Sequence, residues 1–285
     1  MQRDKLIEYC AINVAAHPHP SGVYSTILNQ AALARVQYWG DHFATISTPV
    51  EREPGFLQGR LVAWTEINQD EPAVDKQKLE EVDLADLDLQ IPDNLGFNGR
   101  IFLYTFRERD HTMFVETRNE FGKTLSARRV SKIIESLLSP EVLGPDAPLV
   151  EVTLIPDEDT LKRIFGLEKL KRLQIHLVRP NADDLDVEEV LAELDAQNAK
   201  SLDKVLTAVS GSEGLIPDQR TTTEAHVAEF NGYVEATGNE ADGGLVYLST
   251  KEHPRVFQRI IADVGSSIAA SLQLAKEAVV RSQSG

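Results

Sequence analysis

The sequence is poor in the features that would place it in a specialised class. Cys10 is the only cysteine among 285 residues, which excludes an internal disulfide and any zinc site built from cysteines. No apolar run reaches the roughly 18 residues that a transmembrane helix needs. The opening stretch, MQRDKLIEYC, also lacks the apolar core of a signal peptide. These absences predict a cytoplasmic protein without membrane insertion.

Recognised catalytic motifs are also missing. The chain holds no phosphate loop, no dinucleotide-binding glycine fingerprint, no HExxH and no GxSxG. A metal-dependent nuclease would need an acid-x-Lys on a strand, and Glu116-Thr117-Arg118 offers Arg in place of that Lys. We therefore predict no catalytic residues, no metal site and no cofactor. A nuclease toxin with an unrecognised active site is the enzymatic alternative.

Two histidine patterns are the candidates for such a site. Arg220 and His226 have the spacing used in HEPN ribonucleases, where both residues lie on one helix, but the three threonines between them favour a strand. His17-Pro18-His19-Pro20 could supply two metal ligands in an extended conformation. The prolines instead favour a bend between a strand at 6–14 and a helix at 21–37, and this is our prediction.

The charge of the chain is strongly negative and unevenly distributed. The formal net charge is −16, which argues against a generic binder of polyanions. Residues 51–93 carry a net charge of −8 and residues 183–203 one of −7, whereas residues 100–179 carry +2. A basic middle between two acidic blocks is typical either of solvated faces of different elements or of an anion-binding groove.

Periodicity predicts an α+β fold with mixed or antiparallel sheets, packed helices and long C-terminal helices. Residues 100–118 read as a hairpin with Arg109-Asp110-His111 at its turn, followed by a helix that Ser126 caps. Residues 183–209 and 256–280 read as long helices, and 224–238 and 244–250 as strands with a turn at Asn231-Gly232. We place a domain boundary between 1–182, an α+β core with the basic segment, and 183–285, and a single domain is the alternative.

The basic middle gives the strongest candidate site. Nine bases on the hairpin, the following helix and a later strand are predicted to contact nucleic-acid phosphates: Arg100, Arg107, Arg109, Lys123, Arg128, Arg129, Lys132, Lys171 and Arg172. Arg128 and Lys132 point away from the apolar face of their helix, so burial does not explain them. The competing account is that these bases neutralise the acidic blocks through surface salt bridges.

Several stretches resemble a known family. IEYCAINVAAHPHP, VTLIPDEDTLKRIFGLEKLKRLQIHLVRPNADD, LDAQNAKSL and NGYVEATG resemble an uncharacterised bacterial family carried under a domain-of-unknown-function label. The resemblance implies genes of mobile elements or defence islands and supplies no catalytic residues. The order of elements is also similar to that of the RexA phage-exclusion sensor. That likeness implies a dimeric, sequence-tolerant DNA-binding protein, from which this chain departs in being acidic.

We therefore expect a non-enzymatic DNA-binding or DNA-sensing subunit of a bacterial antiphage, abortive-infection type of defence system. A homodimer is expected from the long helices, the likeness and Asn198, which interrupts an apolar helical stripe. Asn198 could equally bond to a local carbonyl or lie where the stripe reaches solvent. Nucleic acid, a second copy and a second defence-system protein are the expected partners. An acidic adaptor that binds a partner protein is the other alternative.

Overall fold

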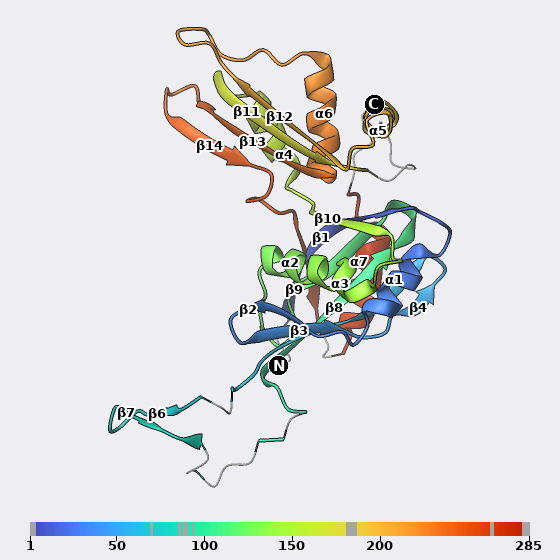
Figure 1. The fold of residues 1–285 in the computed structure, drawn as a ribbon, viewed down its shortest axis with the longest axis vertical. Coiled ribbons are helices and arrows are strands. Elements are labelled where there is room, and N and C mark those ends of the chain that lie inside the picture. Colours follow the sequence, from blue (N-terminus) through green and yellow to red (C-terminus); the bar gives the residue numbers. More distant parts are fainter. Residues whose placement is uncertain are drawn as a thin grey trace.

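The computed structural model describes residues 4–68, 71–84, 87, 91–92, 94–180, 187–262 and 265–280. The protein has two lobes, each built on an antiparallel sheet (Figure 1). The first lobe holds a nine-stranded sheet and the second a four-stranded sheet. A short hairpin of β6 (Ala73–Asp75) and β7 (Glu80–Val82) extends away from the first lobe.

Strand β1 (Lys5–His17) is the central element of the first lobe, which confirms the strand predicted at 6–14. It pairs with β9 (Thr112–Arg118) along one edge. Along its other edge it pairs first with β15 (Val256–Ile261) and then with β10 (Leu149–Leu154). Its residues are buried on both faces, because helices cover both sides of the sheet.

The remaining strands continue the sheet beyond β9. The order is β9, β8 (Phe97–Arg107), β5 (Phe56–Thr65), β3 (His42–Ile46) and β2 (Val36–Trp39), and β4 (Val50–Glu53) also pairs with β5. The predicted hairpin is confirmed as β8 and β9. They are joined by a 3₁₀ turn at Glu108–Asp110 and by His111, whose φ is 53°.

Helices α1 (Val23–Ala31), α2 (Ala127–Leu137) and α3 (Pro140–Leu143) share one core with Cys10 and Ile12. Helix α7 (Ser267–Glu277) packs with Tyr9 and Ala11 on the other face. Helix α2 begins as predicted, since the Ser126 hydroxyl accepts the amide of Arg129. Helix α1 is shorter than the predicted 21–37. The amide of Leu33 bonds to the carbonyl of Ile46, and the β-forming residues after it become β2.

The second lobe carries helices on only one face of its sheet. The strand order is β12 (Ser201–Thr207), β11 (Lys169–Val178), β13 (Gly232–Asn239) and β14 (Leu245–Ser249). Buried side chains of β11 share a core with α4 (Glu158–Phe165), α5 (Glu188–Ala196) and α6 (Gln219–Phe230). Figure 1 shows α5 and α6 on one side of this sheet, and the opposite face is open.

The second lobe is inserted between two strands of the first. The chain leaves after β10 and returns at β15, and Pro156 pairs with Pro254 in the neck between the lobes. Asn13 Nδ2 of β1 donates to the carbonyl of Phe230 at 3.0 Å and to Oδ1 of Asn231 at 2.9 Å, which binds the lobes together. The boundary predicted at 182/183 lies in 181–186, outside the described residues, and the strands on either side of it, β11 and β12, pair with each other.

The long helix predicted over 183–209 is wrong over its second half. Residues 183–186 lie outside the described residues, α5 ends at Ala196, and Ser201–Thr207 forms strand β12. Asn198 adopts φ of 51°, and the amide of Ala199 bonds to the carbonyl of Leu194 at 2.8 Å. This is a left-handed C-terminal cap, so Asn198 ends the helix instead of interrupting a stripe.

Two further predictions are corrected. Residues 219–230 form helix α6, because Asp218 caps its first turn through the amide of Thr221 at 2.8 Å, and this outweighs the strand preference of the threonines. The helix predicted at 256–280 begins only at Ser267, since Val256–Ile261 pairs with β1 as β15. The α+β class with antiparallel sheets is confirmed, and the long C-terminal helices are not. Of the described helices, none has the length and apolarity to cross a membrane.

Candidate nucleic-acid interface

Arg107 is the one predicted contact that the fold buries. Its side chain is 1% exposed and forms a two-point ion pair with Asp110, at 2.8 and 2.6 Å. Its Nη1 also donates to the carbonyls of Ala275 and Ala278 at the end of α7. These bonds satisfy the open end of a helix in the core. Arg107 therefore holds α7 on the sheet and cannot contact nucleic acid.

Three other predicted bases lie away from the start of α2. Arg109 is exposed at the β8–β9 turn, at the opposite end of β8 from Arg100. Lys171 and Arg172 lie on β11 in the second lobe, where Lys171 occupies an irregularity in the pairing with β13. Arg172 is exposed and donates to Oε1 of Gln174 at 2.8 Å.

The remaining five bases gather around the start of α2, and we call this set the α2 surface. Its members are Arg100, Lys123, Arg128, Arg129 and Lys132. Arg100 is fixed across the loop that precedes the helix, because Nη1 donates to the carbonyl of Thr124 at 3.2 Å and Nη2 to the hydroxyl of Tyr38 at 3.4 Å. The other four side chains are exposed, as the apolar face of α2 requires.

The α2 surface gathers five bases in one place without acidic partners among the described residues, a state that scattered bases such as Arg60 and Lys169 share. Within the part of the chain that the structure describes, none of its five bases forms an ion pair. By contrast, Arg118 pairs with Glu8, Arg163 with Glu240 and Lys276 with Glu53. The account in which the predicted bases neutralise the acidic blocks therefore does not describe the α2 surface.

An exposed aromatic side chain adjoins this surface. Trp39, at the end of β2, is 59% exposed, and the guanidinium of Arg129 lies 4.8 Å from its ring centroid. His42, across the β2–β3 turn, stacks on Trp39 with centroids 4.9 Å apart and planes 13° from parallel. A cation over an indole is a favourable pairing that also holds the ring in position.

The open face of the second sheet belongs to the other lobe and carries aromatic side chains. Side chains along β11 and β13 alternate between the buried face and the open face, and His176 and Tyr233 lie on the open face. Their rings stack with centroids 4.8 Å apart. Asp203 binds His176 Nδ1 at 2.7 Å, and the ammonium of Lys251 lies 3.0 Å from the Tyr233 ring centroid. The face thus combines aromatic rings with locally balanced charges.

Lys251 connects this face to α2 electrostatically. Burial lowers the pKa of Lys251, the carboxylate of Glu235 raises it, and the positive charge of Arg128 lowers it further. Arg128 belongs to α2 in the first lobe, whereas Glu235 belongs to β13 in the second. The charge of Arg128 in the first lobe thus acts on Lys251 in the second.

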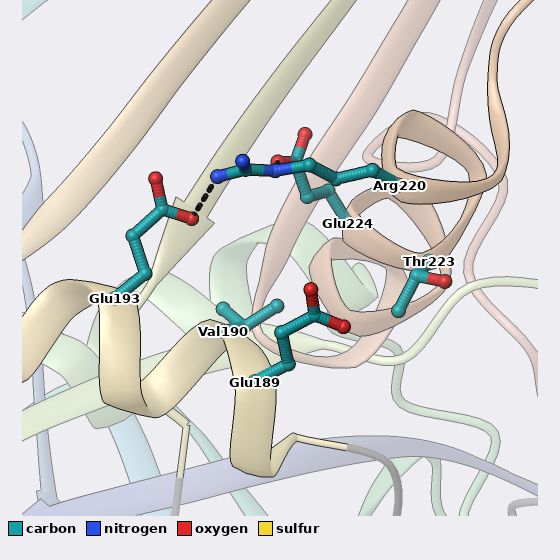
Figure 2. A pocket seen from close by; sticks show the side chains of 6 residues that line it. All are labelled: Glu189, Val190, Glu193, Arg220, Thr223 and Glu224. Atoms are coloured by element: carbon teal, nitrogen blue, oxygen red, sulfur yellow. Dashed lines mark hydrogen bonds and ion pairs between the residues drawn. The ribbon is translucent and has the colours of Figure 1, made fainter.

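The histidine patterns do not form a catalytic site. Arg220 pairs with Glu193 and Glu224, while His226 is exposed and lies 6.2 Å from the ring of Phe165. Figure 2 shows Arg220 of α6 and Glu193 of α5 pointing toward each other across a small pocket, whose other lining residues include Glu189 and Thr223. In this arrangement Arg220 joins two helices.

His17 and His19 lie on the bend between β1 and α1, as the prolines predicted. His17 Nε2 bonds to the carbonyl of Arg179 at 2.9 Å, and burial lowers the pKa of His17. The ring of His19 packs edge-on against His111 at 4.6 Å. The described residues contain no group of three or more His, Cys, Asp or Glu side chains arranged to hold a metal.

Sequence reasoning found the basic residues but missed their aromatic neighbours Trp39, His42, Tyr233 and His176, and also Lys251. Trp39 and His42 flank Gly40-Asp41, a tight-turn signal that could have indicated a hairpin end with both rings on one side. Tyr233 and Lys251 are 18 positions apart and meet only because β13 and β14 pair. No local pattern indicates that encounter.

The comparisons with known proteins identify a family and nothing finer. A search of curated proteins finds no match to this chain. A family model described as a domain of unknown function, DUF4747, matches residues 5–276, which include both sheets and the interface. The chain therefore belongs to the DUF4747 family.

Proposed function

We propose that this protein is a non-enzymatic nucleic-acid-binding protein of the cytoplasm that contacts the phosphate backbone through the α2 surface. The observation that supports it best is the clustering of five bases that form no ion pair with any described residue. Acidic residues outnumber basic ones by 45 to 29, so partners for these bases are abundant in the chain. Bases left without partners among so many acids are suited to an external anion.

The surrounding acids restrict how a polyanion can approach. A net charge of −16 repels phosphate from most of the molecule, while Arg128, Arg129 and Lys132 present positive charge from one helix. The first turn of α2 adds exposed amide groups that favour anions. This arrangement supports one binding orientation with few phosphate contacts, and hence a modest dependence of affinity on salt.

Charge reversal at α2 tests the proposal. The double variant Arg128→Glu, Lys132→Glu should weaken binding of a labelled oligonucleotide by at least about ten-fold and reduce the slope of log K against log salt by about 2. Fluorescence anisotropy from about 20 to 200 mM salt measures both quantities. Circular dichroism and a thermal melt should match the wild type, because both side chains are exposed.

A matched control changes the charge equally at a distant place. Lys76→Glu with Lys78→Glu alters two exposed bases beside the β6–β7 hairpin and should leave affinity within about two-fold. If the α2 variant binds like the control, or if the wild type binds no nucleic acid at low salt, the proposal is wrong.

The proposed biological role is that of a DNA-sensing subunit in an antiphage defence system, and it rests on the organisational likeness to the RexA sensor. Cells that express the protein with its neighbouring genes should reduce phage plaque counts, and the Arg128→Glu, Lys132→Glu variant should lose this protection. The homodimer stays a prediction that light scattering can test. It no longer has the support of Asn198 or of long helices, since Asn198 is a helix cap.

A second candidate function is that of a protein adaptor, favoured by the β6–β7 hairpin. This hairpin lies in the acidic block 51–93 and exposes Val74 at 60% and Leu79 at 82%. Exposed apolar side chains on a projecting hairpin suit a partner protein. Val74→Ser with Leu79→Ser should abolish capture of such a partner and leave nucleic-acid affinity unchanged.

A further inference from the structure

We infer that the nucleic acid bound is single-stranded. Its nucleobases stack on aromatic side chains of both lobes, and its phosphates follow the basic side chains of α2. This inference rests on the proposed function and specifies the ligand class of the same interface. It names a surface that we call the belt: His176, Tyr233, Lys251, Arg128, Arg129, Trp39 and His42.

The belt is a series of neighbouring aromatic and basic side chains that crosses from one lobe to the other. In the second lobe, His176 stacks on Tyr233, and Lys251 lies over the Tyr233 ring. In the first lobe, Arg129 lies over Trp39, which stacks on His42. Arg128 precedes Arg129 on α2, and Figure 1 shows α2 below the segment that carries Lys251, whose pKa the charge of Arg128 lowers.

The elements that carry the belt are arranged along one side of the molecule. Helix α2 contacts β2, which ends in Trp39. In Figure 1, α2 lies between the second sheet and β2, below the segment that returns from β14 toward β15. Lys251 belongs to that returning segment. A strand of nucleic acid could therefore pass from the open sheet face over α2 to the β2–β3 turn.

Aromatic exposure is what favours a single strand over a duplex. In a duplex the faces of the bases are already stacked on one another, and a protein ring can reach only their edges. Trp39 is 59% exposed at a sheet edge, and Tyr247, on the open face, is 50% exposed. Aromatic rings beside cations are a common platform for unstacked nucleobases. A nucleobase that stacks on Trp39 would take the place of His42 or Arg129, and one that stacks on Tyr233 the place of His176 or Lys251.

The charge on the open face agrees with this division of roles. Asp203 bonds to His176, Glu235 lies 3.9 Å from the Lys251 ammonium, and Arg172 bonds to the neutral Gln174, so this face has acidic as well as basic groups. A nearly neutral aromatic face suits bases better than phosphates. Arg128, Arg129 and Lys132 of α2 form no ion pair with the described residues, and a single strand can turn its phosphates toward them while its nucleobases face the sheet.

Three ligands of one sequence distinguish single-strand binding from duplex binding. They are a 20-nucleotide DNA strand, the RNA strand of the same sequence, and the DNA duplex. We expect the wild type to bind at least one single strand about ten-fold or more tightly than the duplex, as measured by anisotropy at one fixed salt concentration. The DNA and RNA strands then show which sugar is preferred. Saturating single strand should also quench the tryptophan fluorescence, and Trp39→Phe should reduce that quenching.

Substitutions of the rings test the stacking itself. Trp39→Leu and Tyr233→Leu should each weaken single-strand binding by about five- to a hundred-fold, in the range measured for lost base stacking. The salt slope should stay unchanged, because no charge is removed. Trp39→Phe and Tyr233→Phe keep an aromatic face and should restore most of the affinity. Melting curves establish that all four variants are folded.

The outcomes separate this inference from the proposal on which it rests. Equal or tighter binding of duplex, or leucine variants that bind a single strand like the wild type, would overturn the inference and leave the α2 surface as a duplex contact. If Tyr233→Leu instead dissociates a dimer in light scattering without changing affinity, the open face is covered by a second copy and the inference is also overturned. Absence of all nucleic-acid binding at low salt overturns both.

Discussion

The two sheets of this protein differ in how many of their faces are covered by helices. The first has α1, α2 and α3 on one face and α7 on the other, and its central strand β1 is buried along almost its whole length. The second has helices on one face only, and β11 alternates between buried and partly exposed side chains. A sheet covered on one side leaves half of its side chains for contacts outside the fold.

Arginines show the consequence of this difference. Arg107, on the covered sheet, faces α7 and satisfies the helix carbonyls. Arg172, on the one-sided sheet, is exposed on the open face beside Gln174. An arginine thus stabilises the fold in the first lobe, whereas an arginine in the second lobe is available to a ligand. Four predictions follow this contrast, beginning with the largest effect.

Loss of Arg107 should be the most damaging change in the covered sheet. Arg107→Met leaves the Asp110 carboxylate and the carbonyls of Ala275 and Ala278 without their donor. Breaking a buried ion pair from one side costs about 3–5 kcal/mol of unfolding free energy. Urea unfolding measures the loss. Arg109→Met, two residues away and exposed, should change stability by no more than about 0.5 kcal/mol. Similar effects of the two substitutions would contradict the buried role.

Each lobe contains a buried carboxyl group that should make stability fall as pH rises. Burial raises the pKa of Glu116, beside Tyr9, to about 7, and burial likewise raises the pKa of Glu229, on α6, to about 7. Between about pH 4.5 and 7 the folded protein keeps protons that the unfolded chain has released, so increasing pH favours unfolding. By about pH 8 this loss of stability is complete.

Urea unfolding at pH 5.5 and 8.0 measures this effect. Glu116→Gln and Glu229→Gln should each flatten the decrease relative to the wild type, and exposed Glu135→Gln should not. His17 acts in the opposite direction, because its lowered pKa favours the folded state as pH rises, so the comparison is between variant and wild type. A steeper decrease in either glutamine variant would contradict the assignment.

Asn13 should matter to both lobes at once. Asn13→Ala removes the donor to the Phe230 carbonyl and to Asn231, and leaving such buried groups unbonded costs about 1–3 kcal/mol. Since the belt crosses the junction, single-strand affinity should also decrease. Asn29→Ala on the exposed side of α1 is the control, and equal behaviour of the two variants would show that Asn13 does not join the lobes.

Substitutions of Asn198 should change the free energy of unfolding the least, but the order of the alanine and glycine variants identifies the backbone conformation. As a left-handed helix cap, Asn198→Ala should cost about 1 kcal/mol, and Asn198→Gly should be neutral or slightly stabilising. In the interior of a long helix the order would be reversed, because alanine favours helix and glycine disfavours it. Thermal unfolding of the two variants decides between these structures of residues 188–207.

The success of sequence reasoning follows the same contrast between the sheets. Strand β1, the β8–β9 hairpin and α2 were predictable because their apolar patterns are long and their caps or turns are explicit. In the second lobe, residues 201–207 matched a helical stripe and 224–230 a strand, since short half-exposed elements fit both periods. There the caps at Asn198 and Asp218 decide the structure.

The candidate site was predictable only in part. Strand alternation gives Arg107 and Arg109 the same face, and nothing local shows that β8 ends at Arg107 and that this side chain meets α7, which begins 160 residues further along the chain. The bases of α2 were found because helix periodicity places them opposite an apolar face. Their aromatic neighbours come from strands whose positions depend on the whole topology.

The neck between the lobes makes the second lobe a separable module. The amide of Asp157 bonds to the carbonyl of His253 at 2.7 Å, and that of Arg255 to the carbonyl of Ile155 at 3.0 Å. Both ends of the inserted segment are therefore adjacent, and both flanking strands are anchored on β1. A short turn could replace residues 157–253 without stretching the first sheet, and the excised segment could be closed into a ring or transplanted into another host protein. In such chimaeras, each half of the interface could be assayed without the other.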